Sequence, residues 1–349
     1  MPILHVGGHS RDVPWRDCRV RVIPAANSRF QLPPHFQSET LPAFAVLLKC
    51  GNLKSCPRFP RLGDLSKVAF ANTTVASLSP ILKRVMERRP APLAWPPLKI
   101  GHRGAAGEAP ENTMASYDLA WRQGVSGIEL DVQLSSDGVP VVIHDARLRR
   151  TTSGGGWVWE HRASVLRRLD AGSWFNRRYR LRARERYAGA RIPLLTEVLQ
   201  WAKARECLAF LEIKDYRPGV AARVVQEIER ADLWRLARLV SFELSSLHEA
   251  RQSSEQARLG LDFSGRLRPI PRALALGAVA LLPYWMIASR GLIRRAHRAG
   301  LQIIPWTVNY PLHMRRMILD GVDGLITNYP ARLTGVVDRF ENAPLQPKL

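Results

Sequence analysis

Cysteine is scarce in this sequence and is not arranged for a disulfide framework or a metal site. Among 349 residues there are four cysteines, Cys18, Cys50, Cys56 and Cys207. They form no C-x-x-C pair, and three of them lie before residue 60. This distribution argues against a disulfide-framed secreted domain and favours reduced thiols in a cytosol.

Long apolar runs are also missing. The most apolar stretch, 273–288, is 16 residues long and is interrupted by Gly277 and Pro283, so it is too short for a spanning helix. It predicts a core helix followed by a buried strand. The amino terminus lacks the basic start, apolar core and small-residue cleavage site of an export signal. We therefore expect a cytoplasmic protein with no stable membrane insertion.

Lysine contributes little to a strongly basic chain. Eight of the 52 Lys and Arg residues are lysines, and the formal net charge is +22 with a pI near 10.9. The arginines are scattered, so the charge favours phosphate-bearing partners in general. A non-catalytic binder of phosphates or nucleic acid is one hypothesis, which steep salt-dependent DNA binding without metal-dependent hydrolysis would support. We expect a small-molecule substrate and no nucleic acid, and make no prediction of the oligomeric state.

The chain divides by composition into three parts. Residues 1–96 carry 14 Lys and Arg against 5 Asp and Glu and show no sustained period. They predict a mostly irregular basic extension with a short helix near 78–88. One hypothesis is that the native protein starts at Met86, which a shortened protein lacking activity or solubility would contradict. Residues 97–340 predict a regular domain, and 341–349 a C-terminal tail.

From residue 97 onward, short apolar runs alternate with amphipathic stretches. The predicted strands are 98–101, 127–134, 140–145, 207–214, 239–243, 258–263, 279–283, 301–308 and 323–327. The predicted helices are 113–123, 195–205, 219–231, 245–252, 289–299 and 311–319. About eight such units predict an α/β fold, a closed (β/α)8 TIM barrel. The segment 146–192 breaks this rhythm and predicts an inserted excursion or an active-site loop.

One predicted strand carries two acids, Glu129 and Asp131, on one face, because residues i and i+2 of a strand point the same way. Glu212 and Lys214 repeat this spacing in a later strand. Residues at the carboxyl ends of barrel strands converge on one mouth. Three carboxylates meeting there predict a site for one hard divalent cation, Mg²⁺ or Ca²⁺.

Two histidines also stand at strand ends. His102 and Arg103 follow the first predicted strand, and His144 lies near the end of the third. Asn112 or Thr113 can cap the helix after the first strand, and a guanidinium matches the oxygens of a phosphate. Taken singly, each feature has a structural alternative: a structural histidine, a solvated acidic edge strand, or a surface ion pair.

Over about 97–340 the sequence resembles the glycerophosphodiester phosphodiesterase family. The resemblance rests on nine elements in order: "GHRG…PENT", "GIELDVQLSSDGVPVVIHD", "LRRTTSGGGWV", "LDAGSWF", "IPLLTEVL", "LEIK", "VSF", "PWTVN" and "GVDGLITNYP". It implies a (β/α)8 barrel that hydrolyses glycerophosphodiesters to glycerol 3-phosphate and an alcohol with a divalent metal. Residues 1–96 have no counterpart in the family's core. Asn328 stands where the family often has an acid, a departure that we expect not to touch the chemistry.

The resemblance implies roles for residues that lie in or just past predicted strands. They are His102 and His144 as the catalytic pair, Glu129, Asp131 and Glu212 as the metal ligands, and Arg103, Lys214 and Trp306 as residues that bind the phosphate or the glycerol.

Phosphodiester hydrolysis needs stabilisation of negative charge at phosphorus and a proton for the departing oxygen. Imidazole titrates near neutral pH, so the two histidines suit proton transfer, one as base and the other as acid. The sequence leaves the two roles open; our hypothesis is His102 as base and His144 as acid. The nucleophile is either the glycerol 2-hydroxyl, giving a cyclic phosphate that water then opens, or water itself. The nearest alternative function is a lysophospholipase D-like phosphodiesterase that acts on lipids.

Overall fold

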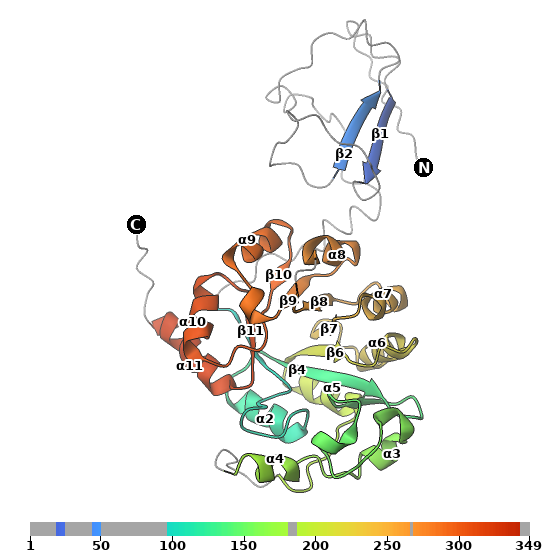
Figure 1. The fold of residues 1–349 in the computed structure, drawn as a ribbon, viewed down its shortest axis with the longest axis vertical. Coiled ribbons are helices and arrows are strands. Elements are labelled where there is room, and N and C mark those ends of the chain that lie inside the picture. Colours follow the sequence, from blue (N-terminus) through green and yellow to red (C-terminus); the bar gives the residue numbers. More distant parts are fainter. Residues whose placement is uncertain (1–18, 25–43, 50–95, 181–186, 266–267, 343–349) are drawn as a thin grey trace, which may run out of the picture. The chain divides into compact units, whose positions relative to one another are not determined.

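The computed structural model in Figure 1 describes residues 19–24, 44–49, 96–180, 187–265 and 268–342. The chain divides into two units, Met1–Ser77 and Leu78–Leu349. In the first unit, β1 (Arg19–Pro24) pairs antiparallel with β2 (Phe44–Lys49), a pairing that the sequence did not predict. The helix expected near 78–88 and the tail 343–349 lie outside the described residues.

The described part of the second unit contains eight parallel strands in the order β10-β9-β8-β7-β6-β4-β3-β11. Their bounds are β3 (Leu98–Gly101), β4 (Gly127–Leu134), β6 (Leu208–Ile213), β7 (Ala237–Ser241), β8 (Leu259–Phe263), β9 (Ala280–Pro283), β10 (Gln302–Ile303) and β11 (Gly324–Thr327). The predicted α/β barrel is confirmed. One predicted strand lies outside this order: β5 (Pro140–Val142) pairs antiparallel with β4 as a side branch.

Backbone hydrogen bonds close the barrel between its last two strands. The amide of Asp323 donates to the carbonyl of Ile303 at 2.9 Å, and the amide of Ile326 donates to the carbonyl of Pro305 at 3.0 Å. On its other side β11 pairs with β3, so the ends of the domain are neighbours. Strand residues that alternate inward fill the barrel interior with an apolar cluster. Its buried members are Ile100, Phe210, Val240, Ala280, Leu282, Ile304 and Ile326.

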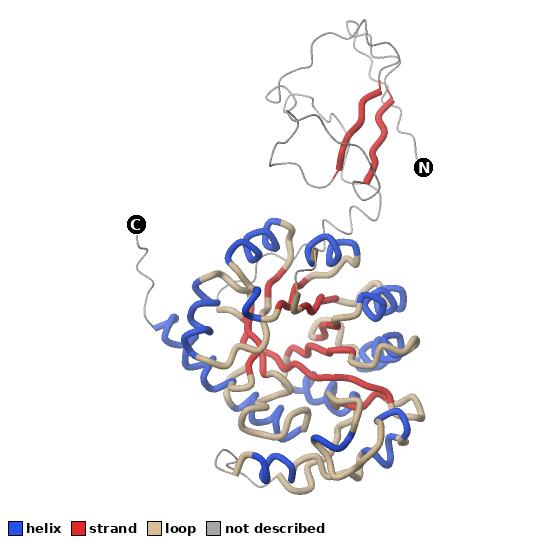
Figure 2. Tube along the Cα trace, viewed as in Figure 1, coloured by secondary structure: helices blue, strands red, loops and turns tan. Residues whose placement is uncertain are grey.

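Helices lie around the strands, as the blue coils around the red segments of Figure 2 show. They are α2 (Met114–Arg122), α5 (Leu195–Ala204), α6 (Val220–Ala231), α7 (Leu244–Ser253), α8 (Pro269–Ala275), α9 (Arg290–Arg298), α10 (Pro311–Leu319) and α11 (Pro330–Asn342). The six predicted helices match described helices to within two residues at each end. The run 273–288 gives the end of α8, then β9, then a short 3-10 turn, η7 (Trp285–Ile287).

The described part of the excursion after β5 forms a small subdomain. Its short helices are η5 (Leu148–Arg150), η6 (Val158–Glu160), α3 (Ala163–Leu166) and α4 (Ser173–Arg178). The first three pack around a separate apolar cluster that includes Val141, Ile143, Leu148 and Leu166. The excursion is therefore anchored to β5, directly before His144. Among the described helices, none combines the length and the apolar character needed to cross a membrane.

Candidate active site

The mouth of the barrel receives ionisable side chains from three neighbouring strands. Asp131 of β4 and Glu212 of β6 are direct register partners, so their side chains emerge next to each other on the same face. Glu129 lies one inward-facing position earlier on β4, and His102 and Arg103 follow the end of β3. These side chains therefore meet at one mouth, as expected of residues at the carboxyl ends of strands in a parallel barrel.

The three acids Glu129, Asp131 and Glu212, here called the acidic triad, are all buried. One carboxylate oxygen of each lies within 4.8 Å of the others. Oε1 of Glu129 and Oδ1 of Asp131 are buried and have no hydrogen-bond partner. Buried carboxylate oxygens are normally satisfied, so these atoms fit a hard, oxygen-seeking cation such as Mg²⁺ or Ca²⁺. Their role as metal ligands stays a prediction.

The pKa values within the acidic triad show that burial, and then repulsion between the acids, opposes ionisation of all three together. Burial, with the charge of Asp131 next, raises the pKa of Glu129 well above its usual range and that of Glu212 to about 7. Burial opposes ionisation of Asp131 too, but Arg103 and other cationic groups lower its pKa to about 2. Positive charge placed among the three acids therefore stabilises their ionised forms.

Arg103 connects the acidic triad to the loop before α2. Its backbone amide donates to Oε2 of Glu129 at 2.9 Å, and its Nε lies 3.1 Å from Oδ2 of Asp131. Its Nη1 donates to Oε1 of Glu111 at 2.7 Å. The residue has a positive φ of 52°, a left-handed conformation that non-glycine residues adopt at a cost. The local contacts hold its guanidinium at the mouth in spite of that cost.

The loop before α2 also orients Asp131. Thr113 is the helix cap, since its side chain accepts from the amide of Ser116. Asn112, the other capping candidate, instead donates from Nδ2 to Oδ2 of Asp131 at 2.7 Å. The hydroxyl of Tyr117 donates to Oδ1 of Asn112 at 3.0 Å and fixes that amide. Nothing in the sequence indicated this contact between Asn112 and Asp131.

Lys214 directly follows β6 and lies beside the acidic triad. Its Nζ is 2.6 Å from Oε1 of Glu212 and 3.7 Å from Oδ1 of Asp131. Burial opposes the charge on the ammonium, but Asp131 and Glu212 raise the pKa of Lys214 above its ordinary value. Lys214 therefore stays cationic at neutral pH and, with Arg103, supplies positive charge next to the proposed metal position.

The expectation that Asn328 does not touch the chemistry is wrong. Nδ1 of His102 lies 2.6 Å from Oδ1 of Asn328, which follows β11 beside β3. If Nδ1 carries the proton and donates it to this oxygen, the lone pair of Nε2 faces the acidic triad, 3.9 Å from Oε2 of Glu129. Burial, with Arg103 next, lowers the pKa of His102 to about 3. His102 is therefore neutral at physiological pH.

His144 meets a different partner. Its Nδ1 lies 2.6 Å from Oδ1 of Asp145, the residue that follows it. Burial lowers the pKa of His144, while Asp131 and Asp145 oppose that shift. Of the two imidazoles, His144 has the carboxylate partner that stabilises its protonated form.

A further arginine, Arg150 of η5, connects these groups. Its guanidinium donates to both oxygens of Asp145, at 2.5 and 3.0 Å, and to both oxygens of Glu111, at 2.8 and 2.7 Å. Glu111 in turn contacts Arg103. The chain of contacts runs from His144 through Asp145, Arg150 and Glu111 to Arg103. Sequence reasoning missed it, although the "LRRTT" element pointed to this turn.

Substituting lysine for Arg150 tests that chain of contacts. Lysine keeps the charge but cannot hold two carboxylates with a planar fork, so His144 and Arg103 lose a shared support. We expect kcat/KM to fall roughly tenfold, in the range found when supporting partners of site residues are lost. Arg149→Lys, at an exposed position in the same turn, is the matched control and should be neutral. Equal effects of the two substitutions would contradict the assignment.

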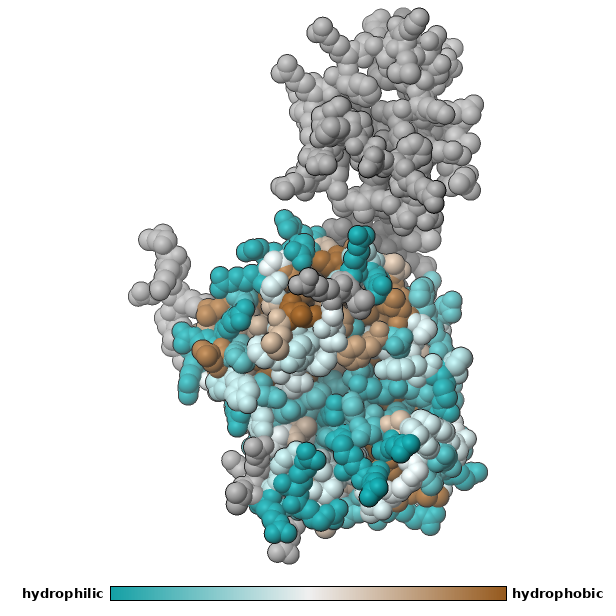
Figure 3. Space-filling model, viewed as in Figure 1, coloured by the Kyte–Doolittle hydropathy of each residue, from teal (hydrophilic) through white to brown (hydrophobic). Residues whose placement is uncertain are grey.

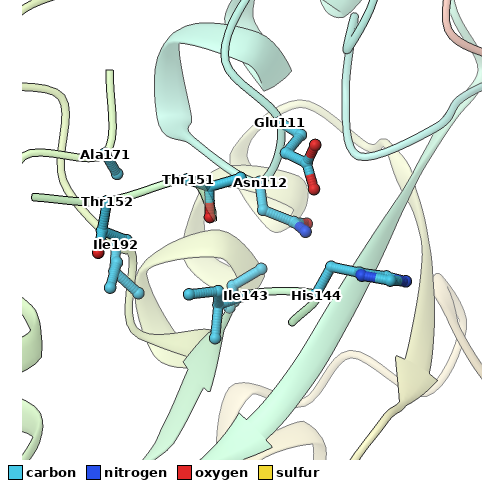
Figure 4. A pocket seen from close by; sticks show the side chains of 9 residues that line it. Glu111, Asn112, Ile143, His144, Thr151, Thr152, Ala171 and Ile192 are labelled. Carbon is cyan, nitrogen blue, oxygen red and sulfur yellow. The ribbon is translucent and has the colours of Figure 1, made fainter. Parts of the chain in front are cut away.

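A small pocket opens beside His144, at the junction of β5, the excursion and the loop before α2 (Figure 4). It is lined by Glu111, Asn112, Val142, Ile143, His144, Thr151, Thr152, Ala171 and Ile192. In Figure 4 the side chains of Glu111, Asn112 and His144 extend to the same side. The polar groups at this edge come from segments that are far apart in the sequence.

Aromatic side chains form the opposite wall of the mouth. Trp306, which follows β10, donates from Nε1 to the carbonyl of Leu282 at 2.8 Å. Its ring centroid lies 5.5 Å from that of Phe242 and 5.6 Å from that of Tyr284. These three half-buried rings, here called the aromatic wall, come from the ends of β7, β9 and β10. They offer an apolar face to the carbon chain of a substrate.

Comparison with known proteins identifies the family. The model of the glycerophosphoryl diester phosphodiesterase family matches residues 102–332. The chain belongs to this family. A glycerophosphodiester phosphodiesterase from Caldanaerobacter subterraneus is 35% identical over 244 residues, which cover 69% of this chain and 97% of the relative. One from Bacillus subtilis is 33% identical over 250 residues, which cover 67% of this chain and 84% of the relative. This confirms the predicted membership and the enzyme class.

Solved structures agree with the fold of this phosphodiesterase. A phosphodiesterase from Oleispira antarctica, in complex with the product sn-glycerol-3-phosphate, is 28% identical with a TM-score of 0.62, over 69% of this chain and 97% of that one. A glycerophosphodiester phosphodiesterase from Agrobacterium tumefaciens is also 28% identical, with a TM-score of 0.58. The match covers 68% of this chain and 98% of that one.

Proposed function

We propose that this phosphodiesterase hydrolyses glycerophosphodiesters to sn-glycerol 3-phosphate and an alcohol with one divalent cation, Mg²⁺ or Ca²⁺. The observation that carries the proposal is the acidic triad, with two buried carboxylate oxygens that have no hydrogen-bond partner, in the mouth of a barrel of this family. The relatives' activity and the product bound by the Oleispira enzyme support the substrate class.

Glu129, Asp131 and Glu212 are the residues that would hold the cation. When bound, the cation neutralises negative charge on the phosphoryl oxygens. Arg103 and Lys214 flank the acidic triad and add donors for the same oxygens, Arg103 through its planar guanidinium and Lys214 as a compact charge. This placement favours the transition state, in which the charge on these oxygens is greatest.

The two histidines transfer protons. His102 is neutral and, with Nδ1 donating to Asn328, can accept a proton at Nε2 from the glycerol 2-hydroxyl or from water. His144 has Asp145 to stabilise its imidazolium and so suits the role of acid to the departing alkoxide. Trp306 and the aromatic wall would lie along the glycerol carbons.

A substrate panel tests the proposed reaction. We expect purified enzyme to release choline and sn-glycerol 3-phosphate from glycerophosphocholine with Mg²⁺ or Ca²⁺, and to lose that activity when a chelator removes the cation. Glycerophosphoethanolamine and glycerophosphoinositol in the same assay report the headgroup preference. Undiminished turnover with the chelator would contradict the metal, and inertness toward all three esters would contradict the substrate class.

A lysophospholipase D-like activity is the second candidate, favoured by apolar side chains at the rim of the mouth. Met286, Tyr310 and Leu312, in segments after β9 and β10, are 68%, 66% and 75% exposed. Figure 3 shows apolar residues gathered on the face in view near α8 and α9. Choline release from lysophosphatidylcholine, compared with glycerophosphocholine, separates the two activities. A cytoplasmic location is part of the proposal.

A further inference from the structure

A fourth acid, Asp262, faces the barrel interior from β8. Two residues earlier on the same face, a Cβ on Gly260 would meet Cδ1 of Leu282 at 2.6 Å and a methyl of Val240 at 2.9 Å, both part of the interior apolar cluster. Since alternate strand residues share a face, Asp262 points inward as well, one layer nearer the mouth. It is the last inward-facing residue of its strand.

Like several active-site residues, Asp262 has a buried side-chain atom without a hydrogen-bond partner. Among the described residues, the buried side-chain atoms without a hydrogen-bond partner are Nε of Arg103, Oε1 of Glu129, Oδ1 of Asp131, Oε1 of Glu212 and Oδ2 of Asp262. All but the last belong to groups already assigned to the cation or the phosphate. An orphaned carboxylate oxygen on a side chain only 5% exposed is costly, so a polar ligand group is its expected partner.

The residues around Asp262 indicate which part of the proposed substrate it would contact. Glu212 pairs with Val240 and Val240 pairs with Gly260, so Asp262 lies two strands from Glu212 and one inward-facing position nearer the mouth. The same register sets Phe242, the inward-facing residue just past β7, beside Asp262. On the other side Asp262 pairs with Leu282, whose carbonyl accepts from Trp306. Asp262 is thus a polar group at the foot of the aromatic wall.

The chemistry of the ligand group follows from this position. Asp262 sets an unpartnered carboxylate oxygen next to the aromatic wall, so its partner is a polar group on the carbon chain that this wall contacts. A glycerol phosphoester has two hydroxyls on that chain. The 2-hydroxyl is one of the two nucleophiles proposed at His102, so the terminal hydroxyl is the one left for Asp262.

We propose that Asp262 is a specificity-determining residue that hydrogen-bonds the glycerol hydroxyl farthest from phosphorus, while the aromatic wall packs along the carbon chain. The inference rests on the proposed function and names a contact within its substrate. A site built to hydrogen-bond a hydroxyl discriminates strongly against an analogue that lacks it, because a buried polar group is then left unpaired. In 1-acyl lysophosphatidylcholine this hydroxyl is esterified, so the contact also favours glycerophosphocholine over the lipid.

The test compares two ligands on three proteins. Calorimetry on the cation-loaded full chain measures Kd for sn-glycerol 3-phosphate and for propane-1,2-diol 1-phosphate, which lacks only the terminal hydroxyl. We expect the wild type to bind the former roughly tenfold more tightly, and Asp262→Leu to remove that preference by weakening only sn-glycerol 3-phosphate. Asp262→Asn keeps an oxygen acceptor and should retain most of the preference. The choline esters of both ligands give the same comparison in kcat/KM.

The outcomes separate the inference from the proposed function. Loss of the preference in Asp262→Leu, with retention in Asp262→Asn, supports the contact. Full preference in the leucine variant, or equal weakening of both ligands, overturns it while leaving glycerophosphocholine hydrolysis in place. If Asp262→Leu does not fold, a wild type without preference between the ligands overturns the inference by itself. A wild type that neither binds sn-glycerol 3-phosphate nor hydrolyses glycerophosphocholine refutes both.

Discussion

Replacing Asp131 with asparagine should lower kcat/KM on glycerophosphocholine by roughly 10³-fold or more, about 4 kcal/mol of transition-state stabilisation. Asp131 has the lowest pKa of the acidic triad, near 2, and is therefore its permanently ionised member. It also lies 3.1 Å from Nε of Arg103 and 3.7 Å from Nζ of Lys214. One substitution therefore removes negative charge from the proposed cation site and the opposite charge beside Arg103 and Lys214, the two proposed phosphate-binding side chains.

Thermal unfolding provides a second measurement. A cation that binds only the folded enzyme raises Tm, so Mg²⁺ or Ca²⁺ should stabilise the wild type and have little effect on Asp131→Asn. Asp215→Asn is the matched control, because Asp215 is also a buried acid after β6 but pairs with Arg217, away from the acidic triad. It should keep both activity and the cation-induced rise in Tm. An Asp131→Asn enzyme that keeps either would contradict the metal assignment.

His144→Ala should abolish most turnover of esters with a poor leaving group. We expect roughly a 10³-fold loss in kcat on glycerophosphocholine, because the choline alkoxide needs a proton as it departs. The loss should be about tenfold or less on glycerol p-nitrophenyl phosphate, whose leaving group is stable as an anion. The ratio of the two losses, measured under single-turnover conditions, reports the role of the imidazole.

The control for this prediction is His161→Ala. His161 lies in the excursion that follows His144, is half-exposed, and contacts the carbonyl of Gly155, so its loss should affect turnover of neither substrate. Equal losses on both substrates in His144→Ala would undo its assignment as the acid. If instead the loss in His102→Ala depends on the leaving group, His102 is the acid and His144 is the base.

Much of the fold followed from the sequence because its signals are local. The 3.6-residue period of the helices and the short apolar runs between them need no knowledge of tertiary contacts. The i, i+2 spacing of Glu129 and Asp131 likewise predicts a shared face, and the parallel topology then brings Glu212 beside them. The strand 140–145 was predicted, but not that it leaves the barrel and pairs antiparallel with β4.

The parts of the site that were missed depend on contacts between distant segments. Arg150 reaches Glu111 across 39 positions of sequence, and its partners are chosen by how the excursion packs. Asp262 sits in an ordinary apolar strand, "LGLDF", and only burial and a missing partner distinguish it. Asn328 seemed remote because it is 226 positions from His102. Barrel closure, a property of the whole domain, makes them neighbours.

That last contact has a consequence for synthesis of the enzyme on the ribosome. His102 emerges at the start of the domain, and Asn328 emerges when nearly all of it has been translated. The imidazole is therefore held in its working orientation only after β11 has docked against β3. Nascent chains that stop short of this strand should lack turnover even if their earlier strands and helices have formed, so hydrolysis begins only with the finished polypeptide.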